Sequence, residues 1–232
     1  MIAEQHAERL RHVPLLAVLE DSQREQLARR AVPRTFEEGE QIFLQGNPGD
    51  ALYFITEGSV RISIESESGR EVTLAIRREG SFFGEMALID GKTRSASAYA
   101  HSRCKCLVLL RDDFQEFVER TPRAALSLLV FLSMRLREAS EQIEDLALRT
   151  VRQRLAAVLA QYAVREGEPD TGGILLPKNV NYRLLTGLLC TSRESVSRAA
   201  SDLVDEGRIE RQGRRFRVID LDGLHEVANE SV

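Results

Sequence analysis

Two groups of residues in this 232-residue chain have the types and spacing needed for chemistry, and the first would bind an anion. It is the run FGEMAL at 83–88 followed by Arg94 and Ser95. A glycine at position 84 lets backbone N–H groups approach a phosphate closely, and a fixed arginine supplies the balancing charge. The carboxylate of Glu85 could accept a hydrogen bond from a ribose hydroxyl. The spacing leaves a second interpretation open, which is a structural Glu85–Arg94 ion pair under a turn.

The second group lies on two short predicted helices that are separated by a turn. The first helix, near 181–189, carries leucines and breaks at Cys190. Ser192 can cap the second helix, near 192–206, by accepting a hydrogen bond from a backbone N–H group of its first turn. The pattern therefore predicts a helix-turn-helix.

The second of these helices has one apolar and one polar face. Its apolar positions follow helical spacing and are Val196, Ala199, Ala200, Leu203 and Val204. The exposed side of its first turns would carry Arg193, Glu194, Ser197 and Arg198. The first residues of a recognition helix enter the major groove, where arginine pairs with guanine and glutamate accepts from cytosine N4. These residue types in this order predict DNA binding.

The charge of the whole chain conceals a basic segment. The chain has 32 Lys and Arg against 36 Asp and Glu, a formal net charge of −4, which taken alone argues against a nucleic-acid partner. Residues 178–217 nevertheless hold nine basic and five acidic side chains. Four of the basic ones gather on a predicted hairpin at 208–220, namely Arg211, Arg214, Arg215 and Arg217. Arginines there would contact backbone phosphates and so position the module on DNA.

A β-rich segment must position the first group of residues. From residue 36 to about residue 110 the sequence alternates short apolar runs with glycine-bearing turns, a pattern typical of many short antiparallel strands. In one of these runs the alternation sends Val60, Ile62 and Ile64 to one face. The segment is therefore predicted to be a sandwich, barrel or roll.

Two capping boxes mark helix starts on either side of this segment. Residues 20–31 predict a short helix in which Ser22 is the N-cap and Glu25 completes the box. Thr150 and Gln153 form the second box, which opens a helix in the carboxy-terminal part of the chain.

An unbroken helix is predicted from Pro122 to about Leu148. Its apolar residues are alternately three and four positions apart, as are the a and d positions of a coiled coil. They are Leu129, Leu132, Leu136, Ala139, Ile143 and Leu146. This regular seam favours pairing with the same helix of a second chain, which would give a homodimer. A helix packed only on its own domain is the alternative.

The long helix divides the chain into three predicted parts with an α+β fold. Residues 13–120 would form the β-rich sensor domain, 121–149 the dimerisation helix and 150–232 the carboxy-terminal domain. Within the last part, the polar run at 166–173 is predicted to be a loop between helices.

Few other residues point to chemistry. Cys104, Cys106 and Cys190 are an odd number and make no disulfide framework, so a reducing cytoplasm is expected. The spacing of Cys104 and Cys106 on a strand indicates filler positions rather than a redox pair. The sequence shows no metal-ligand spacing, no nucleophile–base set and no apolar run of membrane length. We therefore expect no metal, no covalent cofactor, no catalysis and no membrane association.

Both groups of residues resemble parts of one known family. Residues 36–110 resemble a cyclic-nucleotide-binding domain, in which F-G-E-x-A-L and R-S-A are similar to the phosphate-binding cassette. Residues 181–217 resemble the winged helix-turn-helix of the Crp/Fnr (cyclic-AMP receptor protein) family of transcription regulators, and S-R-E-S-V-S-R is similar to its recognition helix. The resemblance extends over about residues 13–220. It implies an amino-terminal cyclic-nucleotide-binding β-roll, a long dimerisation helix and a carboxy-terminal winged helix-turn-helix.

The resemblance also implies roles for individual residues. A cyclic nucleotide effector, with cyclic AMP as the first expectation, would be held by Gly84, Glu85, Met86, Ala87, Arg94 and Ser95. The dimer helix would meet this ligand near Arg135 and Ser140. A palindromic, TGTGA-like site in double-stranded DNA would be read by Arg193, Glu194 and Arg198. Effector binding would shift the homodimer toward its DNA-competent state, with RNA polymerase as the expected further partner.

Two positions depart from the family pattern. In cyclic-AMP-responsive members a Thr-Ser pair on the dimer helix contacts the adenine, whereas this chain has Ala139 and Ser140, so the identity of the base stays open. Cys190 stands where the family usually has a glycine. Two alternatives therefore remain. One is the same DNA-binding regulator with a vestigial pocket or a pocket for a different ligand, switched by oxidation of Cys190. The other is a cyclic-nucleotide-binding regulatory subunit that controls an enzyme and ignores DNA.

Overall fold

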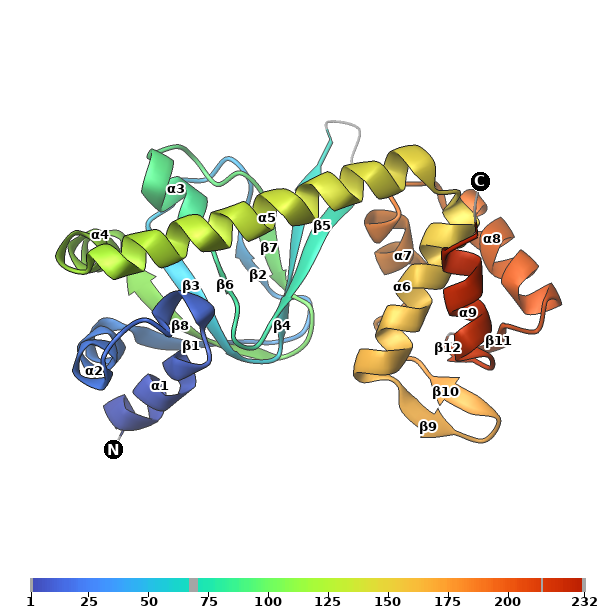
Figure 1. Ribbon diagram of the computed structural model, residues 1–232, viewed down its shortest axis with the longest axis horizontal. Helices are drawn as coiled ribbons and strands as arrows, with labels where there is room; N and C mark the ends of the chain where they lie inside the picture. The colour runs from blue at the N-terminus through green and yellow to red at the C-terminus, as the bar shows by residue number, and fades with distance from the viewer. Residues whose placement is uncertain (1, 67–70, 214, 231–232) are drawn as a thin grey trace. The chain divides into compact units, whose positions relative to one another are not determined.

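The computed structural model describes residues 2–66, 71–213 and 215–230, which divide into two compact units (Figure 1). The first unit comprises Met1–Arg137 and the second Glu138–Val232. The boundary between them falls inside helix α5 (Pro122–Leu148), which is unbroken as the sequence predicted. The long helix is therefore shared by both units.

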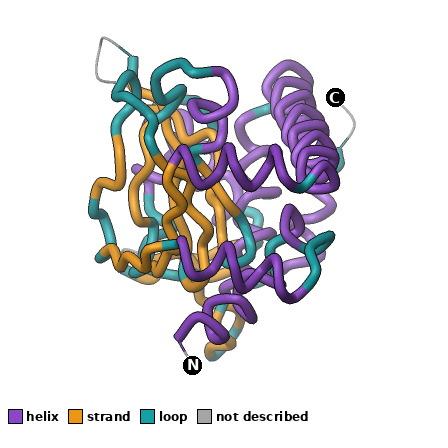
Figure 2. The backbone as a smooth tube through the Cα atoms, turned by 90° about the vertical axis from the view of Figure 1, so that its left-hand side faces the viewer, coloured by secondary structure: helices purple, strands orange, loops and turns teal. Residues whose placement is uncertain are grey.

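The first unit is a β-roll with helices packed along one of its sheets. Its strands are β1 (Val32–Phe36), β2 (Gln41–Phe43), β3 (Ala51–Glu57), β4 (Ser59–Glu65), β5 (Glu71–Arg78), β6 (Phe82–Phe83), β7 (Ser97–Ala100) and β8 (Cys104–Leu110). They form two antiparallel sheets in the orders β1-β8-β3-β6 and β2-β7-β4-β5, and lie side by side as the orange segments of Figure 2. Its helical segments are α1 (Ile2–Arg11), the 3-10 turn η1 (Pro14–Leu16), α2 (Asp21–Arg30), α3 (Glu85–Asp90), α4 (Arg111–Arg120) and the first half of α5.

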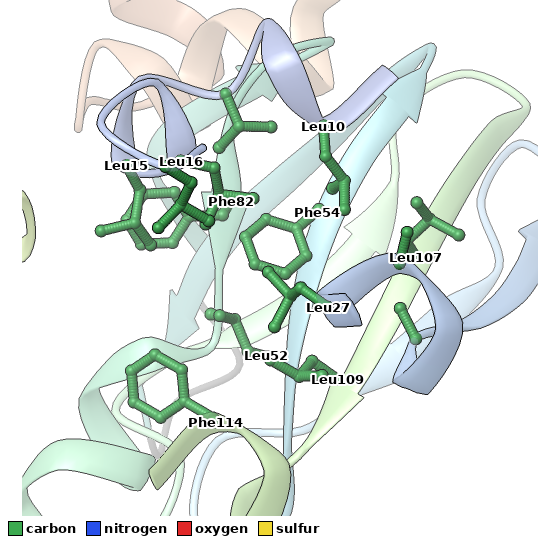
Figure 3. Packing of buried hydrophobic residues seen from close by; sticks show 14 of the residues in the cluster. Leu10, Leu15, Leu16, Leu27, Leu52, Phe54, Phe82, Leu107, Leu109 and Phe114 are labelled. Atoms are coloured by element: carbon green, nitrogen blue, oxygen red, sulfur yellow. The ribbon is translucent and has the colours of Figure 1, made fainter. Parts of the chain in front are cut away.

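The sheet that contains β3 is buried on both faces. Because successive side chains of a strand point to opposite faces, Leu52 and Phe54 face the helices while Tyr53 and Ile55 face the interior of the roll. The first face packs into a large apolar cluster with α1, α2 and α4, seen in close-up in Figure 3, which includes Leu10, Leu16, Leu27, Phe82, Leu107, Leu109 and Phe114. This cluster fixes β3 and β6, the two strands that precede the candidate ligand residues.

The second apolar cluster fills the roll between its two sheets. It contains Cys104 and Cys106, which are buried beside Ile55 and Phe83. The two cysteines are core filler, as their spacing predicted. The neighbouring Cys104 thiol and burial raise the pKa of Cys106, so this thiol stays protonated at neutral pH.

Three local predictions for the first unit are wrong. Helix α2 is capped at Glu20, whose N–H group donates to Gln23, rather than at Ser22 with Glu25. The predicted single face of Val60, Ile62 and Ile64 is broken by a bulge at Ile62, which leaves Ser63 buried and both isoleucines half-buried. The apolar run after Phe83 forms the short helix α3 instead of a strand, since Gly84 turns the chain with a φ of 87°.

The second unit packs four helices against a small antiparallel sheet. The helices are α6 (Val151–Glu166), α7 (Tyr182–Leu188), α8 (Arg193–Asp205) and α9 (Leu221–Ala228), in addition to the end of α5. The sheet has the order β11-β12-β10-β9, formed by β9 (Glu168–Asp170), β10 (Gly173–Leu175), β11 (Ile209–Gln212) and β12 (Arg215–Val218). The capping box of Thr150 and Gln153 is confirmed at the start of α6.

The sequence missed two elements of the second unit. The run at 166–173, predicted to be a loop, forms most of the β9–β10 hairpin, because β10 gains hydrogen-bonding partners from β12 at Val218 and Arg217. Three-residue strands carry too little periodicity to be found from sequence, so this tertiary pairing decides their structure. Helix α9, capped by Asp220, was also not predicted. It packs on α6 through Leu224 and Val227.

Candidate functional site

The ligand residues predicted from the sequence meet around the side chain of Arg94. This guanidinium is 3% exposed and donates from Nη1 to the carbonyl oxygen of Gly84 at 2.8 Å and from Nη2 to that of Ala51 at 2.9 Å. It thereby joins two backbone segments, 49–51 before and at the start of β3 and 84–88 at the start of α3. We call these two segments, together with Arg94, the cradle.

The cradle requires glycine at two positions where backbone and side chains crowd together. A Cβ atom on Gly84 would lie 2.7 Å from Arg94 Nη1, and its φ of 87° is strained for any other residue. A Cβ atom on Gly49 would lie 2.3 Å from the Cβ of Ala87 and 3.3 Å from Arg94 Cζ. Gly49 is a site residue that the sequence did not predict. Nothing in the sequence indicated that it lies against Ala87, 38 positions away.

Arg94 retains a donor that no described residue uses. Its Nε is buried and has no hydrogen-bond partner among the described residues. The cation lies 4.2 Å from the ring centroid of Phe43 and 5.8 Å from that of Tyr53. Burial lowers the pKa of Arg94, which measures the cost of holding this charge away from water. A buried cation with an unused donor fits an anionic group such as a phosphate.

The other predicted ligand residues lie in the first turn of α3 or directly after Arg94 in the sequence. Glu85 is buried at the first position of α3, and Ala87 is buried two residues further on. Ser95 is exposed and donates from Oγ to the sulfur of Met86 at 3.4 Å. The alternative of a Glu85–Arg94 ion pair is wrong, because Arg94 makes its ion pair in the described part of the chain with Asp50, at 3.6 Å.

The two α5 residues expected near the ligand, Arg135 and Ser140, belong to different units. Arg135 donates from Nη2 to the carbonyl oxygen of Phe82 at 2.8 Å, two residues before Gly84, and its cation lies 4.5 Å from the ring centroid of Phe131. It therefore connects α5 to the strand that leads into the cradle. Ser140 is exposed on the part of α5 that belongs to the second unit. Its role toward the ligand stays a prediction.

The predicted seam of α5 is largely exposed. Leu129, Leu136 and Ile143 have exposed fractions of 60%, 70% and 67%. Ala139 and Leu146 are exposed as well, whereas Leu132 packs in part against the apolar cluster of the first unit. Most of the seam thus presents apolar surface on the outside of a single chain.

The helix-turn-helix has the cap that the sequence predicted at Ser192, and a further cap at Asn181 that it did not. The side chain of Asn181 accepts from the N–H group of Leu184 at the start of α7, and Ser192 Oγ accepts from that of Ser195 at the start of α8. Between the helices, Cys190 has a φ of 50°, the one positive φ among the described residues other than glycine. The turn therefore uses a glycine-like conformation at the position where the family usually has glycine.

The expected recognition face lies on α8. Arg193, Glu194 and Arg198 are exposed and Ser197 is half-buried, while the apolar face is buried except for half-buried Val204. The Arg193 and Arg211 cations lie 5.6 and 5.9 Å from the ring centroid of Tyr182 on α7. These arginines, Tyr182, Arg183, Arg215 and Phe216 line an open pocket of about 470 Å³ between the two helices and the β11–β12 wing.

The wing holds its arginines by internal contacts. Arg211 donates to the carbonyl oxygen of Ser197 at 3.3 Å, and Arg215 Nε donates to that of Leu176 at 2.7 Å. Arg217 pairs with Asp170 at 2.7 Å and with Glu210 at 3.0 Å. The fourth wing residue, Arg214, lies outside the described residues. Two carboxylates therefore balance the charge of Arg217 within the fold, and its contact with phosphates stays a prediction.

A β-roll with an arginine-centred cradle and a winged helix-turn-helix together define the class of DNA-binding regulators that carry a cyclic-nucleotide-binding domain. Residues 33–121 match the family model of the cyclic nucleotide-binding domain, and residues 153–227 match that of the Crp-like helix-turn-helix domain. The chain belongs to the Crp/Fnr family of transcription regulators.

Relatives support this assignment over most of the chain. A cyclic AMP receptor protein from Thermus thermophilus is 37% identical over 174 residues, which cover 75% of this chain and 77% of the relative. A CRP-like cAMP-activated global transcriptional regulator from Mycobacterium tuberculosis is 30% identical over 198 residues, covering 85% and 88%. These matches and the turn geometry give no support to a redox switch at Cys190.

Solved structures of the family have the same fold. A CRP/FNR-family transcriptional regulator from Thermus thermophilus matches with a TM-score of 0.75 at 29% identity, covering 87% of this chain and 100% of that one. A c-di-GMP-responsive global regulator from Xanthomonas campestris matches with a TM-score of 0.77 at 25% identity, covering 86% and 99%. Among the described residues, no helix has the length and apolar character to cross a membrane. The described His, Cys, Asp and Glu side chains also form no cluster suited to a metal ion.

Proposed function

We propose that the chain is a homodimeric, effector-gated transcription regulator in which a cyclic nucleotide binds in the cradle. Cyclic AMP is the first candidate for this effector. The observation that carries this proposal is the buried, unpartnered Nε of Arg94, held between the carbonyl groups of Gly84 and Ala51. Gly84 brings backbone close to that cation. Glu85 and Ser95, adjacent in sequence to Gly84 and Arg94, would bind ribose and phosphate oxygens. Coupling to DNA binding of about 1–3 kcal/mol is the usual scale for such regulators.

The identity of the effector is best tested directly. Two relatives are named for cyclic AMP, and one structural neighbour is c-di-GMP-responsive. Ala139 beside Ser140 offers one hydroxyl fewer for a base than the cyclic-AMP-responsive pattern. Calorimetric titration with cyclic AMP, cyclic GMP and c-di-GMP should show heat of binding for one of them and a change in operator affinity. Binding of none of these three nucleotides would overturn the effector part of the proposal.

The exposed seam of α5 supports a homodimer. Leu129 and Ile143 would stay in contact with water in a single chain, and apolar side chains at heptad spacing are buried by pairing two such helices. A twofold-symmetric dimer would place two recognition helices on the two halves of a palindromic, TGTGA-like site. Sedimentation velocity of the full chain should give the mass of a dimer, and a monomer at micromolar concentration would contradict it.

Binding to double-stranded DNA, and not catalysis, is the proposed activity. The exposed Arg193, Glu194 and Arg198 support base reading, and RNA polymerase is the partner expected for such a regulator. The competing function is a regulatory subunit that binds a nucleotide and ignores DNA. Operator binding measured at two salt concentrations separates them, because phosphate contacts make the affinity fall with salt. Negligible operator binding at both salt concentrations would favour the regulatory subunit that ignores DNA.

A further inference from the structure

The two backbone segments of the cradle are joined by a second arginine besides Arg94. Arg111, the first residue of α4, donates from Nη2 to the carbonyl oxygens of Gly49 and Ala87, at 2.5 and 3.0 Å. Its Nη1 reaches the carbonyl oxygen of Leu88 at 3.5 Å. Arg94 joins the same two segments through Ala51 and Gly84. Each segment is therefore held at both of its ends by a guanidinium.

Arg111 is itself fixed relative to the first of these segments. Its backbone N–H group donates to the carbonyl oxygen of Asp50 at 2.8 Å, between the two residues that the arginine side chains contact. The side chain is half-buried, and α4 packs on the large apolar cluster through Phe114. The backbone from which the guanidinium extends is thus fixed by β3 and by the packing of α4.

Small movements of these segments would reach Arg94 directly. The ideal Cβ position of Gly49 is 2.3 Å from Ala87 Cβ and 3.3 Å from Arg94 Cζ, so the two segments and the guanidinium are already in contact. A planar guanidinium can hold several carbonyl oxygens in fixed directions, whereas the ammonium of a lysine is a point charge on a flexible stem. The two contacts that join the segments both come from Nη2 of Arg111, and the planar guanidinium fixes the direction of this nitrogen.

We propose that Arg111 is a positioning residue of the cradle, which sets the spacing of its two backbone segments and so the direction in which Arg94 presents its Nε to a bound phosphate. As regards the ligand, this inference rests on the function proposed above. Arg111 makes no contact with the anion in this scheme. It acts through Gly49, which lies against Arg94, and through Ala87, which lies against Gly49.

The positive charge of Arg111 also affects Arg94 and, through it, the binding of an anion. Burial lowers the pKa of Arg94, and the nearby positive charge of Arg111 lowers it further. An anion in the cradle would reduce the repulsion between these two guanidinium groups. Replacing Arg111 by lysine keeps the charge and removes the fork, so the two contributions can be separated by comparing Arg111→Lys with Arg111→Gln.

The test compares Arg111→Lys with a matched structural arginine of the same unit. Arg24 is also buried and donates to a backbone carbonyl, that of Leu16 at 3.0 Å, and to Asp21 at 2.7 Å, but both lie near the start of α2. In the full chain, Arg111→Lys should weaken cyclic AMP binding by about tenfold or more, as expected for losing hydrogen bonds from a charged donor. Arg24→Lys should lower the thermal stability and leave that affinity unchanged. Equal loss of affinity in both variants, or none in Arg111→Lys, would overturn the proposal.

A second measurement does not depend on the ligand. Amide hydrogen exchange of the unliganded protein should be faster at 49–51 and 84–88 in Arg111→Lys, and unchanged there in Arg24→Lys. If the wild type binds no cyclic nucleotide while exchange rises as expected, the proposed effector is wrong and the positioning role stands. Wild-type exchange rates in Arg111→Lys contradict the positioning role whatever the wild type binds.

Discussion

Arg217 on β12 donates from Nη2 and Nε to the same carboxylate oxygen of Asp170 on β9, at 2.7 and 3.2 Å. The hydrogen bond from Arg217 lowers the pKa of Asp170, so the pair is fully ionised at neutral pH. The guanidinium joins the wing to the β9–β10 hairpin. Of the basic residues that the sequence assigns to the wing, this one has its charge balanced by carboxylates within the fold.

Removing the carboxylate should return that charge to the wing. In Asp170→Asn, Arg217 keeps Glu210 as a partner but gains freedom to reach a phosphate. The plot of log affinity against log salt for nonspecific DNA should become steeper by up to about one phosphate contact. Asp222→Asn removes an equal charge from α9 and serves as the control. Identical slopes in the two variants would show that only net charge matters.

Gly84 and Gly91 flank α3, and comparing substitutions at the two positions separates the effect of steric crowding from that of backbone strain. Both have positive φ, but a Cβ on Gly84 would meet Arg94 at 2.7 Å while one on Gly91 would meet nothing within 4 Å. Gly91→Ala should cost about 1–2 kcal/mol of folding free energy through its φ alone and leave effector affinity intact. Gly84→Ala should cost more and abolish effector binding. Urea denaturation and calorimetry measure the two effects, and equal effects of both substitutions would contradict the crowding at Gly84.

Cys190 has a backbone conformation that favours glycine. Cys190→Gly should stabilise the second unit by about 0.5–1 kcal/mol, since relief of the left-handed strain exceeds the entropy that glycine adds to the unfolded chain. Cys190→Ala keeps the strain and removes the thiol, so it separates the two properties. Hydrogen exchange of α7 and α8 amides should slow in the glycine variant relative to alanine. If both variants exchanged faster than the wild type, the thiol contact with Gly187 would matter more than φ.

The exposed seam of α5 predicts where dimerisation can be broken without unfolding. Ile143→Glu places a charge at a position that is 67% exposed in the single chain, so the protomer should keep its thermal stability while the dimer dissociates. Val164→Glu on α6, at a position that is 66% exposed, is the matched control and should remain dimeric. Sedimentation velocity distinguishes them. A dimeric Ile143→Glu variant would place the interface elsewhere.

Arg193→Ala should affect one position of the operator. A bidentate contact to guanine is worth about 1–3 kcal/mol, so the loss should appear at a single base pair when operator variants are compared. Arg165→Ala, which removes an exposed charge from α6, should weaken all sequences slightly and equally. If Arg193→Ala also weakened all sequences equally, its contact would be to a phosphate.

The sequence predicted those features that depend on neighbours along the chain. The caps at Thr150 and Ser192, the length of α5 and the apolar face of α8 all follow from local spacing, and the structure confirms them. Local spacing also brought Gly84 and Arg94 into one site. Family resemblance added the expectation of what that site would hold.

The remaining features depend on contacts between distant segments. Gly49, Ala51 and Arg111 belong to the cradle because β3 and α4 bring them to α3, and no spacing rule connects them with Arg94. The pairing of β10 with β12 places Asp170 beside Arg217, which changed the charge available on the wing. A count of charges along the sequence cannot include such ion pairs, because the sequence alone does not show which carboxylate lies beside which arginine in a folded sheet.

Because α5 is unbroken, it determines where a chimera could join the amino-terminal domain of one family member to the carboxy-terminal domain of another. The two compact units meet between Arg137 and Glu138, but that point is inside a hydrogen-bonded helix, and a junction there would fuse two unrelated helical faces in one rod. At Thr150 the helix has ended and the next one is capped by its own residues through Gln153. A chimera joined at Thr150 would keep every helix of both parents whole. The best junction for exchanging domains therefore differs from the boundary between the two compact units.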